Sequence, residues 1–240
     1  MNDPLRPNSP TPFGFDRGVQ DASFYAGDAA ARQNVLRNTY WLLSLSLIPT
    51  VFGAYVGLET GVFRSMGAYL VLFLLSMGLI FAIQRFKDSG TGVALLLGFT
   101  FIMGVLMSSV LAFTLHFANG AFLIALAFGG TALIFFTMAT IATVSKRDFS
   151  AWGQWLFVGL IVVIIASVVN MFLQMPALML ALSVVSIVIF SGFMVFDIQR
   201  VVRGGETNYI TATLSIYLDL INVFQNLLMI LGIFGGSSRD

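Results

Sequence analysis

Two aspartates near the C-terminal end stand inside long apolar runs, where carboxyl groups are rare. A short polar segment, VVRGGETNY, joins the runs that carry Asp197 and Asp219, and Asn208 within it lies 11 residues from each acid. If the runs are antiparallel helices, the two acids lie at similar depth, within about one helical turn or roughly 5 Å of each other. A carboxylate inside a spanning segment costs at least about 2.5–3.5 kcal/mol, so both residues indicate a functional site.

The chemistry of such a pair is exchange of protons and cations. Two carboxyl groups held close together cannot both be charged at low cost, so they titrate as a unit. When both are ionised, their oxygens suit a hard cation such as Ca²⁺. We therefore predict that Asp197 and Asp219 form a pH-sensing pair and serve as possible Ca²⁺ ligands. The alternative is a structural polar contact between helices, for which Asn or Ser would serve at lower cost.

A nearby cation is needed when both carboxyl groups are charged. Arg85, which ends an earlier apolar run, is the preferred candidate, and Arg200, one turn from Asp197, is the second. For each arginine the alternative is an anchor that reaches the lipid headgroups.

Further polar side chains accompany the acids on both runs. One face of the last run carries four of them at spacings of 4, 3 and 4: Ser215, Asp219, Asn222 and Asn226. On the preceding run, Ser183 and Ser186 share a helical face with Asp197. In lipid such faces turn toward other helices or water, so we expect this stripe to support the acid pair.

The composition places the chain in a lipid bilayer. Hydrophobic residues make up 58% and charged residues 10%, whereas soluble proteins have about 25% charged residues. The absence of Cys and the single His exclude disulfides, thiolate metal sites and sites with two histidines. With no nucleophile–base pairing, phosphate loop or zinc motif, we expect no enzyme, no cofactor and no nucleic-acid partner. An intramembrane aspartyl protease is the enzyme alternative that paired aspartates raise, but activating surroundings for it are missing.

The apolar runs predict an all-α fold with seven transmembrane helices. They comprise the uncharged stretch between Arg37 and Glu59, the stretch between Arg64 and Arg85, and about 90–114, 120–144, 151–173, 177–200 and 209–234. The segment HFANG separates the third and fourth helices, and Pro176 begins the sixth. We predict a disordered cytoplasmic tail over residues 1–33 and a membrane domain over 34–240.

The distribution of basic residues predicts the orientation. With the N-terminus in the cytoplasm, ten of the twelve Lys and Arg residues fall in cytoplasmic segments, and Arg64 and Arg239 fall on the other side. The positive-inside rule therefore predicts an N-in, C-out protein whose acidic hairpin turns at the cytoplasmic face.

Several long segments resemble a known family. FDIQR around Asp197, SIYLDLINVFQNLL around Asp219 and SKRDFS after the fourth run resemble the Bax inhibitor-1 family of transmembrane proteins. The resemblance covers roughly residues 35–240. GGTALIFF, NMFLQMPAL and GGETNYITATLSIY are similar in particular to the bacterial branch that modulates the FtsH protease. It implies a multi-pass protein of the bacterial inner membrane.

The resemblance implies two functions of different classes. In bacterial members with both aspartates it implies a pH-sensitive calcium leak channel, in which the acid pair engages an arginine that ends the second helix. The matching residues here are Asp197, Asp219 and Arg85. The FtsH-modulating branch implies a regulatory protein that binds this protease, but that branch lacks the acid at the position of Asp219. The leak channel is our first hypothesis, and FtsH modulation is the alternative.

Overall fold

The computed structural model describes residues 16–235, which form seven α-helices and no strand. The helices are α1 (Asp16–Thr60), α2 (Met66–Arg85), α3 (Gly90–Leu115), α4 (Gly120–Val144), α5 (Trp152–Leu173), α6 (Pro176–Val202) and α7 (Tyr209–Gly235), with a short 3-10 helix η1 (Val62–Arg64) after α1. All seven are long and apolar enough to cross a membrane, since about 20 residues at 1.5 Å each span the hydrocarbon core. The predicted seven-helix fold is confirmed.

The first helix is longer than the sequence predicts. The expected disordered tail covers residues 1–33, whereas α1 begins at Asp16, well before its spanning part, Ala29–Thr60. The segment between Asp16 and Arg32 is rich in alanine and contains no proline, so it can extend a helix that the spanning part has already nucleated. Residues 1–15 lie outside the described part of the chain.

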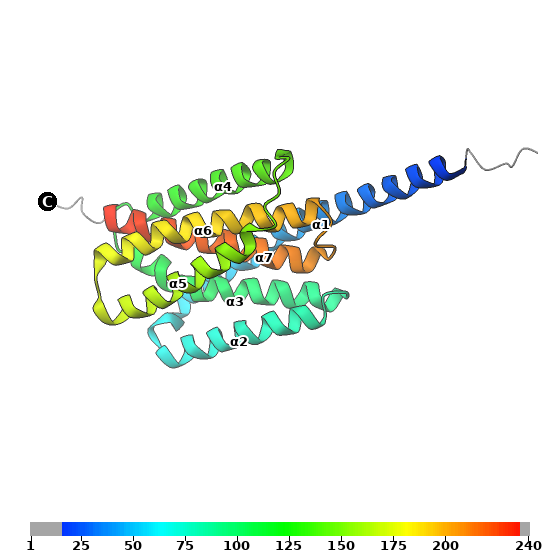
Figure 1. Ribbon diagram of the computed structural model, residues 1–240. Coiled ribbons are helices and arrows are strands. Elements are labelled where there is room, and N and C mark those ends of the chain that lie inside the picture. Colours follow the sequence, from blue (N-terminus) through cyan, green and yellow to red (C-terminus); the bar gives the residue numbers. More distant parts are fainter. Residues whose placement is uncertain (1–15, 236–240) are drawn as a thin grey trace, which may run out of the picture.

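Helix α7 occupies the centre of the bundle and contacts each of the other helices except α5 (Figure 1). Helix α6 packs along α7, and α1, α3 and α4 contact other faces of α7. Tyr217, Val223 and Leu228 of α7 are completely buried. Because α7 has neighbours on most sides, a polar residue placed on it is held inside protein rather than in lipid.

The peripheral helices turn large apolar side chains outward. In α5 only Val163 is buried, and in α2 only Ser76 and Ile83 are. Trp155 and Phe172 of α5 are among the most exposed apolar residues. Such exposure is expected of helices that lie in lipid. Helix α2 packs mainly on α3 and is therefore loosely attached to the rest of the bundle.

Glycines bring α1 and α3 into close contact. A Cβ atom added to Gly53 would collide with the backbone of Phe101, and one added to Gly104 would collide with the backbone of Thr50. Gly57 approaches Ser108 in the same way. Small residues let membrane helices pack backbone to backbone, so these positions fix α1 against α3.

One end of the bundle collects the α2–α3 turn, the α4–α5 loop and the α6–α7 turn, and the N-terminal part of α1 projects beyond it (Figure 1). The α6–α7 turn includes Gly204, whose φ of 78° favours glycine. We call this end of the bundle the hairpin end, after the α6–α7 turn. The basic-residue distribution predicts that the hairpin end faces the cytoplasm.

Candidate functional site

Asp219 lies in the buried core of the central helix. Its residue is only 5% exposed, and its neighbours on α7, Tyr217 and Ile221, are buried as well. Among the described residues, no N–H or hydroxyl group donates a hydrogen bond to its buried Oδ2 atom. An unsatisfied buried polar atom destabilises a fold by about 1–3 kcal/mol, so the position of Asp219 calls for a functional explanation.

Asp197 faces Asp219 from the last turns of α6. The two carboxyl groups lie within hydrogen-bonding range of each other, and the Asp197 side chain is 13% exposed. A carboxylate is an acceptor only, so a hydrogen bond between the two groups requires a proton on one of them. The structure therefore brings together the two acids that the sequence singles out, in an arrangement that can hold a proton.

Arg200 is the cation beside the pair. Its Nη1 atom lies 3.7 Å from Oδ1 of Asp197, and its Nη2 atom lies 3.7 Å from Oε2 of Glu206. The guanidinium carbon also lies 5.6 Å from the ring centroid of Phe196. Asp197 thus has a cation, whereas Asp219 forms no ion pair among the described residues. Because Arg200 is partly exposed, this ion pair contributes no more than about 1 kcal/mol.

Arg85 is not part of this cluster. It is the exposed last residue of α2 and forms no ion pair with either acid within residues 16–235. The sequence analysis ranks Arg85 above Arg200 as the partner of the acids, but in the structure Arg200 is the contacting arginine. The reason is geometric: Arg200 is on the same helix as Asp197, one turn away, while α2 contacts α7 only marginally.

The polar stripe of α7 lies beside the pair but does not bond to it. Ser215, Asn222 and Asn226 are partly buried. The side-chain amide of Asn222 donates to the Leu218 carbonyl at 2.7 Å, and that of Asn226 donates to the Asn222 carbonyl at 2.8 Å. None of the three interacts with the carboxyl groups of the pair. The stripe therefore continues away from the pair along one face of α7.

A clamp that the sequence analysis missed fixes the α4–α5 loop to α6. Oε1 of the buried Gln199 accepts a hydrogen bond from the Phe149 amide at 2.7 Å, and its Nε2 donates to the Arg147 carbonyl at 2.8 Å. Arg203 donates to the same carbonyl at 2.6 Å and pairs with Asp148 at 3.3 Å. A neutral Gln near a helix end is usually a surface residue. In the sequence, the position of Gln199 two residues after Asp197 was the only indication of this role.

Asp148 in this loop is exposed and strongly hydrogen-bonded. The hydroxyl and the backbone amide of Ser150 both donate to its Oδ1 atom, at 2.6 and 2.9 Å. These bonds, with a smaller contribution from Arg203, lower the pKa of Asp148 below its ordinary value of 3.8. Asp148 is therefore charged throughout the neutral range and belongs to the clamp.

A second missed residue, Asn208, ties the hairpin turn to the α2–α3 turn. Its Oδ1 atom accepts from the amides of Ile210 and Thr211 and caps α7. Its Nδ2 atom donates to the Lys87 carbonyl at 2.9 Å and to Oδ1 of Asp88 at 2.8 Å. The end of α2 is thus hydrogen-bonded to the hairpin that carries the acid pair.

Seven spanning helices, with a carboxyl pair between α6 and the central helix α7, define a polytopic membrane protein with an ionisable intramembrane site. No group of three His, Asp or Glu residues that could hold a metal ion occurs within the described chain. The pair alone thus offers two carboxylates, and any further ligands of a cation would be neutral oxygens or water.

Comparison with known proteins identifies the family. Residues 32–236 match the family model described as inhibitor of apoptosis-promoting Bax1, so the chain belongs to the Bax inhibitor-1 family. It is 42% identical over 207 residues to the modulator of FtsH protease YccA of Escherichia coli K12, which covers 86% of this chain and 91% of that relative. An uncharacterized membrane protein of Vibrio cholerae is 40% identical over 204 residues, covering 85% of this chain and 91% of that relative.

The relatives also agree with the predicted location. The YccA protein of a second Escherichia coli strain, also 42% identical over 207 residues, is named an inner membrane protein. With its seven spanning helices, the present chain is a multi-pass protein of the inner membrane.

Proposed function

We propose that this protein is a pH-sensitive calcium leak channel gated by the Asp197–Asp219 pair. The observation that carries the proposal is the placement of two carboxyl groups within hydrogen-bonding range of each other, on α6 and on the central helix α7. Carboxylates inside a membrane protein mark ion or proton pathways more often than structural contacts. Seven spanning helices and membership of the Bax inhibitor-1 family support the same proposal.

The gating step in this proposal is loss of the proton that the pair holds. Without it the two carboxylates repel each other, and only Asp197 has a cation, Arg200, beside it. Glu206, on the far side of Arg200, adds a negative charge and competes for that cation. The second carboxylate must then acquire another cation, and its oxygens suit Ca²⁺.

Helix α2 is the part of the bundle proposed to move. It has few buried residues and ends in the exposed Arg85 at the hairpin end. In the proposed latched state, Arg85 supplies the cation that the deprotonated pair requires. The latch therefore consists of Asp197, Asp219 and Arg85, with Arg200 as the arginine that contacts the pair when it holds a proton.

Calcium flux into liposomes tests the proposal. Purified wild-type protein should pass Ca²⁺ at a rate that changes between about pH 5 and pH 8, because the pair titrates as a unit. Asp197→Asn and Asp219→Asn should each remove that pH dependence. Asp148→Asn is the matched control, because it makes the same chemical change in an exposed loop. If both pair variants retain the wild-type pH profile, the latch does not exist.

The second candidate function is modulation of the FtsH protease. Its specific support is the 42% identity to the modulator of FtsH protease YccA, over 91% of that relative. Helix α1 also begins at Asp16, 13 residues before its spanning part, which gives a second protein a helical segment outside the bilayer to contact.

Copurification tests this second function. FtsH should be recovered with the full-length protein from membranes that contain both proteins, and recovery should fall when residues 1–28 are deleted. The deletion leaves the spanning part of α1 intact. Absence of FtsH from the full-length sample would remove this candidate, whatever the outcome of the flux assay.

A further inference from the structure

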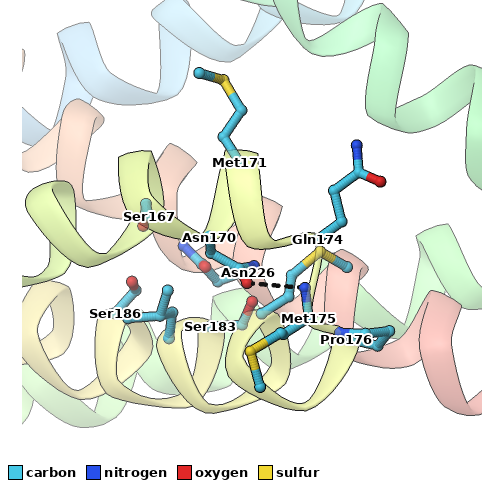
Figure 2. Close-up of a pocket in the computed structure, with 11 residues that line it drawn as sticks. Ser167, Asn170, Met171, Gln174, Met175, Pro176, Ser183, Ser186 and Asn226 are labelled. Atoms are coloured by element: carbon cyan, nitrogen blue, oxygen red, sulfur yellow. Dashed lines mark hydrogen bonds between the residues drawn. The ribbon is translucent and has the colours of Figure 1, made fainter.

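A pocket with both polar and apolar side chains lies toward the end of the bundle opposite the hairpin end. It forms where the end of α5 and the start of α6 meet α7, and it has a volume of about 450 Å³. Its polar lining, drawn in Figure 2, comprises Ser167, Asn170, Gln174, Ser183, Ser186 and Asn226. One liquid water takes about 30 Å³, so the pocket has room for several.

Two hydroxyl groups in this pocket lack hydrogen-bond partners. Ser183 and Ser186 are only 4% and 5% exposed, and neither forms a hydrogen bond within the described chain. Elsewhere in the core, buried hydroxyls such as that of Ser46 donate to the carbonyl one turn earlier on their own helix. In Figure 2 the Ser183 and Ser186 hydroxyls lie on the side of α6 that faces α5. Neither Oγ atom is among the fully buried unpaired atoms of the described chain, so both hydroxyls remain open to a partner inside the pocket.

The lining indicates the chemistry of that partner. Besides the apolar side chains of Met171, Met175, Pro176, Met179 and Leu182, it contains hydroxyl and amide groups but no charged side chain. Hard cations accept hydroxyl, amide and water oxygens as ligands, and a site without carboxylates releases them readily, as conduction requires. An anion would call for Arg or Lys, and neither lines this pocket.

The pocket continues toward the carboxyl pair along α7. Asn226 lines the pocket, Asn222 follows one turn deeper, and Asp219 lies seven residues from Asn226. At 1.5 Å per residue, the pocket wall and the buried acid are separated by about 10 Å along the helix. The polar stripe of α7 therefore connects the two sites.

We propose that this pocket is a water-filled vestibule that binds a hydrated cation at the end of the protein predicted to face outward. The inference deepens the proposed leak function, because the vestibule would deliver Ca²⁺ to the Asp197–Asp219 pair. It commits to a hydrated cation as the occupant. A lipid chain between α5 and α6 is the competing occupant, and the experiment distinguishes the two.

The chain contains no cysteine, so single cysteines can be introduced without background labelling. Ser183→Cys and Ser186→Cys probe the pocket with nearly isosteric changes. Ser191→Cys is the matched control, because Ser191 is also a buried serine of α6 without a hydrogen bond but does not line the pocket. Val188→Cys controls for lipid exposure, since Val188 is 67% exposed on the same helix.

The measurement is the rate of modification by a positively charged, membrane-impermeant methanethiosulfonate added from the outer side. Ser186→Cys should react at least about tenfold faster than either control, because only an accessible, ionisable thiol reacts. Added Ca²⁺ should slow this reaction at least about twofold, because the cation occupies the same oxygens. The unfolding temperature of each variant should equal that of the wild type. This control excludes local opening of the fold as the cause of the labelling.

Three outcomes would overturn the inference. Labelling of Ser186→Cys as slow as that of Ser191→Cys would mean that water does not fill the pocket. Rapid labelling by an uncharged, lipid-soluble maleimide but not by the charged reagent would identify a lipid occupant. Labelling without Ca²⁺ protection would exclude the cation. If wild-type protein passes no Ca²⁺ while labelling and protection hold, the leak proposal fails and the vestibule stands as a cation site.

Discussion

Replacement of Asp219 by asparagine is the most informative change to this protein. Asp219→Asn keeps the size of the side chain but gives its second polar atom two hydrogens to donate. In the wild type, that atom is the buried Oδ2 that accepts no hydrogen bond from the described N–H and hydroxyl groups. In the variant, the amide NH2 group can donate a hydrogen bond to the neighbouring carboxylate of Asp197 without a bound proton.

The size of the effect follows from the partners of each acid. Asp219→Asn replaces the proton-dependent hydrogen bond of the pair by one from a neutral amide to the charged Asp197, and a hydrogen bond to a charged group is worth about 1.5–3 kcal/mol. Asp197→Asn instead separates Arg200 from its carboxylate and leaves Asp219 as the only acid in the core. We therefore expect Asp219→Asn to be more stable than Asp197→Asn by about 1–3 kcal/mol.

Thermal unfolding in detergent at neutral pH measures this difference, and liposome flux of the same preparations measures function. Asp219→Asn should unfold at a higher temperature than Asp197→Asn while both lose the pH dependence of Ca²⁺ flux. If Asp219→Asn is the less stable of the two, the oxygen that the structure leaves unsatisfied has a partner, and the account of the pair is wrong.

Three further predictions concern the parts of the fold that hold the pair in place. Gly104→Ala should destabilise the fold by about 1–3 kcal/mol, because the added Cβ would collide with the backbone of Thr50. Gly98→Ala should not, because no atom lies within 4 Å of its added Cβ. The unfolding temperatures of the two variants test this difference. Gln199→Leu should destabilise by about 1–3 kcal/mol because it leaves the Phe149 amide without its acceptor, whereas Gln84→Leu makes the same change at an exposed position and should not; equal losses in thermal unfolding would contradict the clamp. Because the pKa of folded Asp148 is lowered from 3.8, its stabilising contribution is present above about pH 4 and is lost as the pH falls through the folded-state pKa. Asp148→Asn should therefore lower the unfolding temperature by the same small amount at every pH between about 5 and 8, and its difference from wild type should shrink in stronger acid.

The spanning helices could be predicted because lipid imposes a simple rule on sequence. In the bilayer, backbone N–H and C=O groups must be hydrogen-bonded within the helix, so uncharged runs of about 20 residues form helices. Breaks such as HFANG and the proline at position 176 then set the ends. The start of α1 at Asp16 escaped prediction because outside the bilayer this rule no longer applies, and helix propensity decides instead.

Helical periodicity predicted the proximity of the two acids but not the other contacts of the candidate site. The equal spacing of Asp197 and Asp219 from Asn208 is a property of the sequence, and antiparallel packing turns it into proximity. Which of Arg85 and Arg200 contacts the acids depends on how closely α2 approaches the hairpin. Helical periodicity does not determine that distance. In the same way, the sequence shows that Ser183 and Ser46 are serines in apolar helices, but not that only Ser46 bonds to its own backbone.

The hydrogen bonds of Asn208 give the proposed latch a mechanical requirement. The same side chain caps α7 through Oδ1 and holds the α2–α3 turn through Nδ2. Arg85 lies two residues before Lys87, whose carbonyl receives one of these bonds. Helix α2 therefore cannot move Arg85 far relative to the hairpin without breaking contacts at Asn208. A rearrangement at the acid pair and a movement of α2 are coupled through this one residue, which is why the hairpin turn, and not only the acids it joins, belongs to the proposed gate.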